Sequence, residues 1–127
     1  MKKEIFNIYI CEKCNNIVEL IDGKVNDLSC CGNTMKRLEA NTFDAAVEKH
    51  VPIYEKVEDE LLVRVGEVEH PMEKEHYIMW IALVTDNRVI KATLFPEQAT
   101  ETRFPYIKGA SIYAYCNKHG LWKAVIE

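Results

Sequence analysis

The sequence predicts an all-β protein, in which a small cysteine-rich segment precedes an antiparallel β-sandwich. From about residue 38 onward, apolar blocks of strand length alternate with turn residues, and no stretch shows a sustained helical period. Before that point the chain has little core material but four of its five cysteines. With 127 residues, 48% of them hydrophobic, the chain is long enough for one domain or two small ones around a buried core.

The front segment, residues 1–37, needs a covalent or metal staple to fold. Residues 5–10 predict a strand that leads into the first cysteine, and Asp22-Gly23 and Cys31-Gly32-Asn33 are turn signals. The four cysteines of this segment read Cys11-Glu12-Lys13-Cys14 and Cys30-Cys31. We expect a metal ion rather than disulfides, because the adjacent pair would be difficult to cross-link to the other two without strain. Their spacing alone leaves structural zinc and iron both open.

The rear segment, residues 38–127, predicts the sandwich. Strands are expected at residues 61–68, 77–84, 88–95, 111–115 and 121–126, with one or two more between residues 39 and 56. Asp86-Asn87 predicts the turn of a hairpin. We also expect residues 61–68 to pair with residues 77–84 as a hairpin, which would bring His70 and His76 to the same end of the sandwich.

All four histidines, at positions 50, 70, 76 and 119, fall in this rear segment together with Cys116. Neutral imidazoles and one thiolate are typical ligands of a redox-active transition metal. Cys116 and His119 lie between two predicted strands, and loops at one end of a sandwich are a rigid place to assemble a site. His50 must reach them from an upstream loop. Two chemically different metal centres in one small chain indicate electron transfer or redox catalysis.

Charge and hydropathy exclude several other classes. The net charge of −4 and the lack of a long basic run give a nucleic acid no electrostatic footprint. The apolar runs are too short to cross a bilayer, and the first residues lack the apolar stretch of a signal peptide, so we expect a cytoplasmic protein. Trp80 and Trp122 are expected to be core aromatics. Taken alone, Glu48 and Lys49 would be a solvated turn.

Several motifs, in the same order along the chain, resemble the desulfoferrodoxin family of superoxide reductases. The motifs are Glu48-Lys49-His50-Val51-Pro52, His70-Pro71-Met72 with Glu75-His76-Tyr77-Ile78 and Trp80-Ile81, and Cys116-Asn117-Lys118-His119-Gly120-Leu121-Trp122. The four front cysteines resemble the desulforedoxin-type domain of the two-iron members. The likeness spans essentially the whole chain and shows no departure at a functional position.

The resemblance implies two iron sites. Residues 1–37 would form a desulforedoxin-like, rubredoxin-type domain that holds iron by Cys11, Cys14, Cys30 and Cys31. Residues 38–127 would form an immunoglobulin-like sandwich that holds Fe(II)/Fe(III) by His50, His70, His76, His119 and Cys116, with the sixth position open. The implied activity is the one-electron reduction of superoxide to hydrogen peroxide. A rubredoxin or similar protein would supply electrons, and the protein would be a homodimer.

Two further residues receive catalytic roles from this resemblance. Lys49 would attract the anionic substrate, because a cation beside an open metal position raises the local superoxide concentration. Glu48 resembles the family carboxylate that occupies the open position once the iron is ferric. Two rivals stay open: a non-catalytic iron electron-transfer protein with saturated metal ions, and a dismutase, which would release oxygen without net consumption of reductant.

Overall fold

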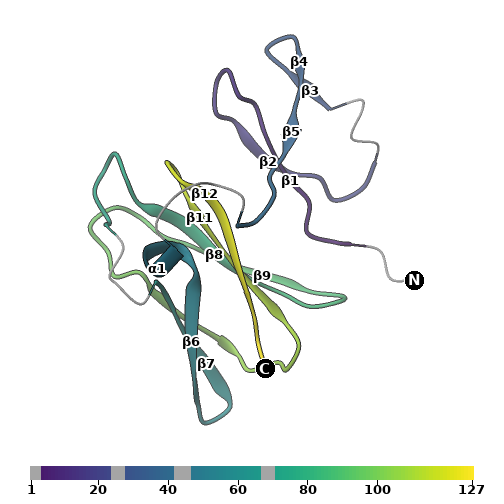
Figure 1. The fold of residues 1–127 in the computed structure, drawn as a ribbon. Helices are drawn as coiled ribbons and strands as arrows, with labels where there is room; N and C mark the ends of the chain where they lie inside the picture. The colour runs from purple at the N-terminus through teal and green to yellow at the C-terminus, as the bar shows by residue number, and fades with distance from the viewer. Residues whose placement is uncertain (1–3, 24–27, 42–46, 67–70) are drawn as a thin grey trace. The chain divides into compact units, whose positions relative to one another are not determined.

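The computed structural model describes residues 4–23, 28–41, 47–66 and 71–127, with the backbone alone for residues 47 and 48. Contacts divide the chain into two units, Met1–Glu39 and Ala40–Glu127. Figure 1 shows both units as β-structure, and α1 (Val47–His50), a single turn, is the one helix among the described residues. None of the helical structure in these ranges has the length and apolar character that a membrane span requires. Because all the described elements except α1 are strands, the predicted all-β class is confirmed.

The first unit is built around a short central strand. β1 (Ile8–Ile10) pairs antiparallel with β2 (Ile17–Glu19) on one side and with β5 (Lys36–Arg37) on the other. Among the described residues, its small core contains the buried side chains of Tyr9, Cys11 and Met35, with Leu20, Leu28 and Cys30 packed against them. A core of this size supplies little hydrophobic stabilisation, which agrees with the expectation that a staple is needed.

A tight hairpin carries the second cysteine pair of this unit. β3 (Ser29–Cys30) pairs with β4 (Asn33–Thr34), and Cys31 and Gly32 form the two-residue turn between them. Both turn residues have positive φ, 53° for Cys31 and 79° for Gly32, which is the conformation that two-residue hairpin turns favour. The turn predicted at Cys31-Gly32-Asn33 is confirmed.

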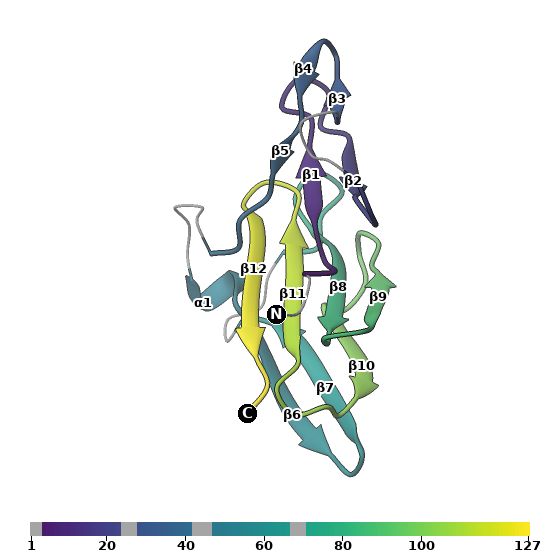
Figure 2. The ribbon, with the colours of Figure 1, turned by 90° about the vertical axis from the view of Figure 1, so that its right-hand side faces the viewer.

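The described residues of the second unit form an antiparallel sandwich of seven strands, whose two sheets appear as separate layers in Figures 1 and 2. One sheet has the order β10-β7-β6, from β6 (Pro52–Val57), β7 (Glu60–Val65) and β10 (Glu101–Pro105). The other has the order β12-β11-β8-β9, from β8 (Ile78–Val84), β9 (Val89–Thr93), β11 (Ser111–Cys116) and β12 (Gly120–Val125). The predicted sandwich is confirmed.

Alternate residues of the facing strands fill the space between the two sheets. In β7, Leu61, Val63 and Val65 are at most 1% exposed, while the residues between them are not fully buried. In β11, Ile112, Ala114 and Cys116 are completely buried in the same core. This two-residue period follows from the pleat of a strand, which sends successive side chains to opposite faces. It also places the side chain of Cys116, the last residue of β11, on the face that points into the core.

The predicted hairpin between residues 61–68 and 77–84 is wrong. β7 pairs with β6 and β10, whereas β8 belongs to the other sheet and pairs with β9 and β11. The two-residue turn at Glu58 and Asp59 joins β6 to β7, so the nearest partner of β7 precedes it in the chain. The turn at Asp86-Asn87 does close a hairpin, between β8 and β9.

In the first unit the sequence predicted a strand at residues 5–10 alone, so β2 to β5 were not predicted. Among the described strands of the second unit, β10 was not predicted. β10 carries two charged residues and ends in Pro105, so its sequence lacks the apolar alternation of the other strands. Its position at the edge of the three-stranded sheet explains this composition, because an edge strand tolerates proline and exposed charge.

Candidate metal centres

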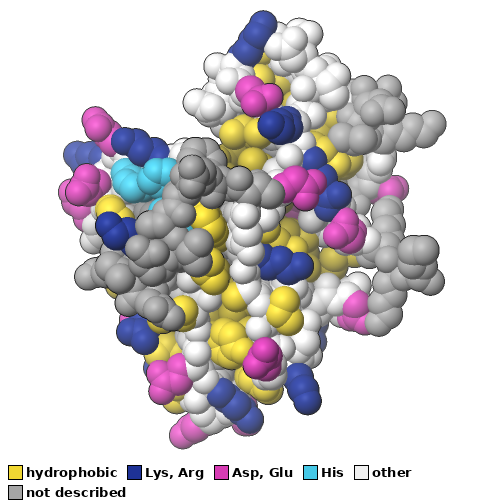
Figure 3. Space-filling view, viewed as in Figure 1, with side chains coloured by type: hydrophobic (Ala, Val, Ile, Leu, Met, Phe, Trp, Pro, Cys, Tyr) yellow, Lys and Arg dark blue, Asp and Glu magenta, His cyan; other side chains and the backbone are white. Residues whose placement is uncertain are grey.

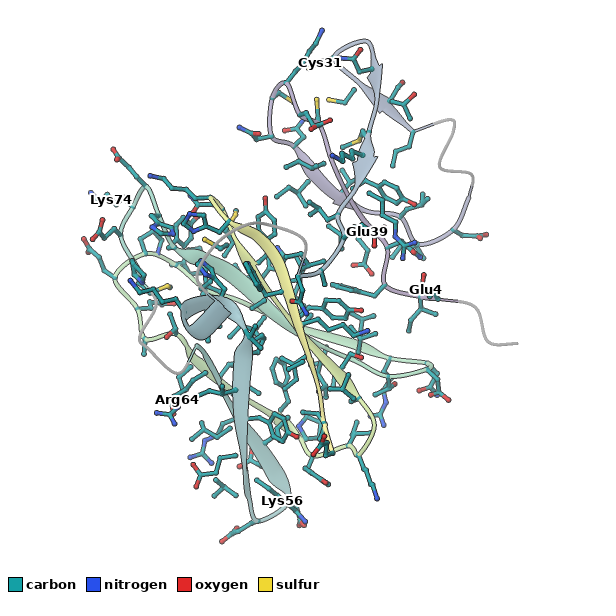
Figure 4. All side chains as sticks on the ribbon, viewed as in Figure 1. Glu4, Cys31, Glu39, Lys56, Arg64 and Lys74 are labelled. Atoms are coloured by element: carbon teal, nitrogen blue, oxygen red, sulfur yellow. The ribbon has the colours of Figure 1, made fainter. Side chains whose placement is uncertain are left out.

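The four cysteines of the first unit converge on one point. Cys11 follows β1, Cys14 lies in the next turn, and Cys30 and Cys31 come from the β3–β4 hairpin. Their sulfur atoms all lie within 4.8 Å of one another, with 3.5 Å between those of Cys14 and Cys30 and 3.8 Å between those of Cys30 and Cys31. Figure 4 shows the sulfur atoms gathered beside the labelled Cys31.

These separations fit one tetrahedral metal ion. Four sulfurs at about 2.3 Å from a common ion would be about 3.8 Å apart. Adjacent residues of a strand point to opposite faces, so Cys30 and Cys31 could not both reach the ion from an extended backbone. The left-handed conformation of Cys31 turns its side chain back toward its neighbour. The strain expected for this adjacent pair is thus accommodated in the hairpin turn.

The pKa values of these thiols diverge in the metal-free protein. The backbone N–H groups of Cys14 and Lys13 stabilise a thiolate at Cys11 and lower its pKa to about 6. Side-chain hydrogen bonding with Cys14, Cys11 and Cys30 raises the pKa of Cys31 to about 12. A bound cation would favour deprotonation of all four, so metal uptake at this site releases protons.

The second group of ligand atoms lies at one end of the sandwich. His50 ends α1, His76 lies in a short turn before β8, and Cys116 and His119 lie at and after the end of β11. Their nitrogen and sulfur atoms all lie within 4.8 Å of one another. His50 Nε2 and His119 Nδ1 are 3.0 Å apart, and Cys116 Sγ is 3.8 Å from His119 Nδ1.

This arrangement also fits a metal ion. Two nitrogens at about 2.1 Å from one ion and at right angles to each other would be about 3.0 Å apart. The rings of His50 and His76 stand nearly perpendicular to that of His119, at 84° and 79°, which lets the nitrogens converge without stacking of the rings. Iron suits three imidazoles and one thiolate as ligands. One end of the sandwich therefore brings together four of the five ligands predicted for the second centre.

Burial and backbone hydrogen bonds act in opposite directions on Cys116. Its side chain is completely buried, and burial raises the pKa of the thiol. The backbone N–H groups of Lys118 and His119 lower the same pKa, because they donate to the sulfur and favour the thiolate. Those N–H groups belong to the tight turn that also carries His119.

Trp122 supports two of the ligands. Its side chain is 2% exposed, as expected for a core aromatic, and its indole stacks on His50 with ring centroids 5.0 Å apart and an interplanar angle of 22°. The indole Nε1 also donates a hydrogen bond of 2.9 Å to the carbonyl oxygen of His119. This contact was not predicted from the sequence, although a tryptophan three residues after a candidate ligand is a usable signal.

Asn117 is a second residue that the sequence analysis missed. It lies between the ligands Cys116 and His119 and makes hydrogen bonds to the residues on either side of His76. Asparagine side chains commonly hydrogen-bond the backbone in turns, so its position between two candidate ligands was a usable signal. The sequence does not reveal which backbone groups it contacts.

The remaining predicted site residues differ in what the structure describes. His70 lies outside the described residues, and Glu48 belongs to α1 but its side chain is not described. Lys49 is exposed on α1, directly before the buried His50. Figure 3 shows histidine side chains reaching the surface, with lysine or arginine side chains next to them. Part of the imidazole surface is therefore open to solvent on this face.

Comparisons with known proteins agree with this geometry. The sequence profile described as desulfoferrodoxin matches residues 42–125, and that of the desulfoferrodoxin N-terminal domain matches residues 3–38. A desulfoferrodoxin from Syntrophotalea carbinolica is 46% identical over 122 residues, which are 95% of this chain and 97% of the relative.

Two solved structures are also similar. The crystal structure of the superoxide reductase from Treponema pallidum has a TM-score of 0.72 and 26% identity, and the match covers 94% of this chain and 96% of that one. The superoxide reductase (1Fe-SOR) from Giardia intestinalis has a TM-score of 0.55 and 31% identity, and the match covers 63% of this chain and 98% of that one. The shorter of these two proteins thus corresponds to a part of this chain.

Proposed function

The chain belongs to the desulfoferrodoxin family, and from this premise we propose that it is a superoxide reductase with two iron centres. The structurally similar proteins from Treponema pallidum and Giardia intestinalis are superoxide reductases. The observation that carries the proposal is the convergence of His50, His76, Cys116 and His119 on one point at the end of the sandwich. Because histidine side chains reach the surface, we infer that a metal ion held by these ligands acts as a catalyst rather than as a structural staple.

The ligand sets follow from the two clusters. Cys11, Cys14, Cys30 and Cys31 hold the iron of residues 1–37, and His50, His76, His119 and Cys116 hold the catalytic iron of residues 38–127, with His70 as its fourth imidazole. When bound, ferrous iron supplies the electron that, with two protons, converts superoxide into hydrogen peroxide. Cys116 contributes a buried negative charge, which favours the loss of an electron from the metal.

Glu48 and Lys49 serve the substrate side of this centre. The protein as a whole is acidic, with a net charge of −4, so a local cation is needed to attract a small anion. Lys49 is exposed and directly precedes His50 in the sequence, which supports this role for its charge. Glu48 would supply a carboxylate ligand to the ferric iron. Replacing Glu48 with alanine should change the ferric absorption spectrum far more than the rate of the first step.

We infer that the four-cysteine centre stores or relays electrons. Cys14 and Cys31 are exposed, so a partner protein can come close to the ligands of this centre. We infer that a rubredoxin-type donor delivers the electrons, that the protein acts as a cytoplasmic homodimer, and that its role is superoxide detoxification in an anaerobe. The family relationship supports these assignments.

The test of the function compares the iron-loaded protein with its Cys116→Ser variant. Stopped-flow mixing with superoxide should yield hydrogen peroxide without oxygen release, and reductant should be consumed in proportion. Addition of azide or cyanide should change the absorption of the catalytic centre. An unchanged spectrum with no peroxide would instead identify a non-catalytic electron carrier, and oxygen release without consumption of reductant would identify a dismutase.

A further inference from the structure

We propose that Asn117 is the positioning residue that holds His76 against Cys116 and His119. The inference rests on the proposed function, because it concerns ligands of the catalytic iron. It assigns a defined task to a side chain that touches neither metal nor substrate.

Asn117 brackets His76 from both sides. Its Nδ2 donates a hydrogen bond of 3.0 Å to the carbonyl oxygen of Glu75, and its Oδ1 accepts one of 3.0 Å from the backbone N–H of Tyr77. Its own backbone N–H donates a third hydrogen bond, of 3.2 Å, to the carbonyl oxygen of Tyr77. Three hydrogen bonds from one residue thus fix the backbone immediately before and after the ligand.

The bracket begins where the regular sheet ends. β11 and β8 pair as far as Cys116 opposite Ile78, and the register already shifts between Tyr115 and Cys116. Such an irregularity ends the regular ladder, so regular strand pairing does not extend to His76. The backbone N–H of Asn117 extends the connection by one residue, to Tyr77, and its side chain extends it to Glu75.

The segment that carries His76 needs this connection. Glu73 and His76 close a tight turn through two mutual backbone hydrogen bonds of 3.0 and 3.1 Å. Met72, just before the turn, packs against the core and accepts hydrogen bonds from Glu97 and Ile78, so the start of the turn is anchored. The residues inside the turn, Lys74 and Glu75, are exposed, so apolar packing does little for the far end, which carries His76, and the bracket anchors that end.

An asparagine suits this position for chemical reasons. The task requires one donor and one acceptor at the end of a short side chain, and the amide supplies both. Asn117 directly follows Cys116 and precedes His119 by two residues. Its hydrogen bonds therefore connect the backbone on either side of His76 to the turn that carries the other two ligands. Three of the four described ligands are then placed relative to one another before any metal binds.

The experiment compares Asn117→Ala with Asn87→Ala in the full-length protein. Asn87 is a matched control, because it is also an exposed turn asparagine of the second unit, but its partner is Thr85 in the β8–β9 turn. The affinity of the histidine-cysteine centre for Fe(II) is measured under anaerobic conditions by competition with a chelator. The ferric thiolate-to-iron absorption band is recorded on the same samples, and the four-cysteine centre serves as an internal standard.

We expect Asn117→Ala to weaken Fe(II) binding at the histidine-cysteine centre by about 10-fold or more, the usual effect of losing a residue that orients a ligand. Its thiolate-to-iron band should shift or broaden, while Asn87→Ala should match the wild type in both measurements. Iron binding at the four-cysteine centre should be unchanged in both variants.

An Asn117→Ala protein that is less stable without metal but binds Fe(II) as tightly as the wild type would overturn the inference and leave the proposed function intact. A wild type that binds no iron at this centre would overturn the proposed function itself, and the inference with it. Should Asn117→Ala fail to fold, amide hydrogen exchange in the metal-free wild type decides. A protected Tyr77 amide supports the bracket, and exchange at the unprotected rate overturns it.

Discussion

Replacing Trp122 with phenylalanine tests whether its hydrogen bond holds the catalytic turn. Phenylalanine keeps an aromatic ring to stack on His50, at 5.0 Å between centroids in the native protein, but it has no N–H to donate. The 2.9 Å hydrogen bond to the carbonyl oxygen of His119 is therefore lost while most of the packing stays. Trp80→Phe is a matched control, because Trp80 is also a buried tryptophan in the four-stranded sheet, stacked on Tyr115 rather than on a ligand.

The expected magnitude follows from this one bond. A typical hydrogen bond contributes about 0.5–1.5 kcal/mol net, and a buried acceptor left without its donor costs about 1–3 kcal/mol. His119 is half-buried, so water can partly replace the lost donor. We expect Trp122→Phe to lower the free energy of unfolding by about 1 kcal/mol more than Trp80→Phe does. For a unit of this size the difference corresponds to about 4–8 °C in Tm.

The assay is thermal unfolding of both metal-free variants followed by circular dichroism, together with the Fe(II) affinity of the catalytic centre. The affinity should fall about tenfold in Trp122→Phe, because the lost bond orients the backbone of a ligand. Equal Tm values for the two variants, combined with wild-type Fe(II) affinity, would refute the reasoning and leave Trp122 as core packing alone.

Three other predictions concern charge and sulfur chemistry. Cys116→Ser should abolish the thiolate-to-iron band of the catalytic centre and lower activity at least about tenfold, and retention of both would contradict the ligand role. Lys49→Ala should slow the second-order reaction with superoxide by up to about tenfold at low salt and flatten its ionic-strength dependence, whereas Lys56→Ala should not; stopped-flow kinetics that match the wild type would be enough to reject this. The pKa of Cys11 is lowered to about 6, below its value in the unfolded chain, so its thiolate adds stability to the metal-free protein that is lost as the pH falls toward 6. Urea unfolding of that protein at pH 8 and pH 6 should show the loss, and thiolate absorbance should report its titration; equal stability at both pH values would count against it.

The sandwich was predictable because its core strands carry a two-residue period that few other structures produce. The structure shows this period in β7 and β11, where the alternate residues Leu61, Val63, Ile112 and Ala114 are buried. β10 was missed because its edge position permits charge and Pro105, so the period is obscured. The partner of β7 was mistaken because a short turn to β6 competes with a longer connection to β8, and composition does not reveal which of two apolar strands is nearer.

The ligands were easier to predict than the residues that support them. Histidine and cysteine are rare enough that their grouping is informative by itself, and both clusters contain the predicted residues that the structure describes. Asn117 and Trp122 act instead through backbone carbonyls and amides of other residues. Such contacts depend on where a strand pair shifts register, and the sequence of either strand alone does not specify that point.

The two centres differ in how much chain must be synthesised before each can form. The sulfurs of the first centre come from residues 11–31 of one unit, so that site can close on a short nascent chain. In the second, His50 meets a partner 69 positions further along, across both sheets. Contacts of such long sequence separation form late, because closure of a long loop loses conformational entropy before the stabilising contacts can form. On the ribosome, the sulfur site should therefore take up its metal first, and the catalytic ion should enter a nearly finished fold.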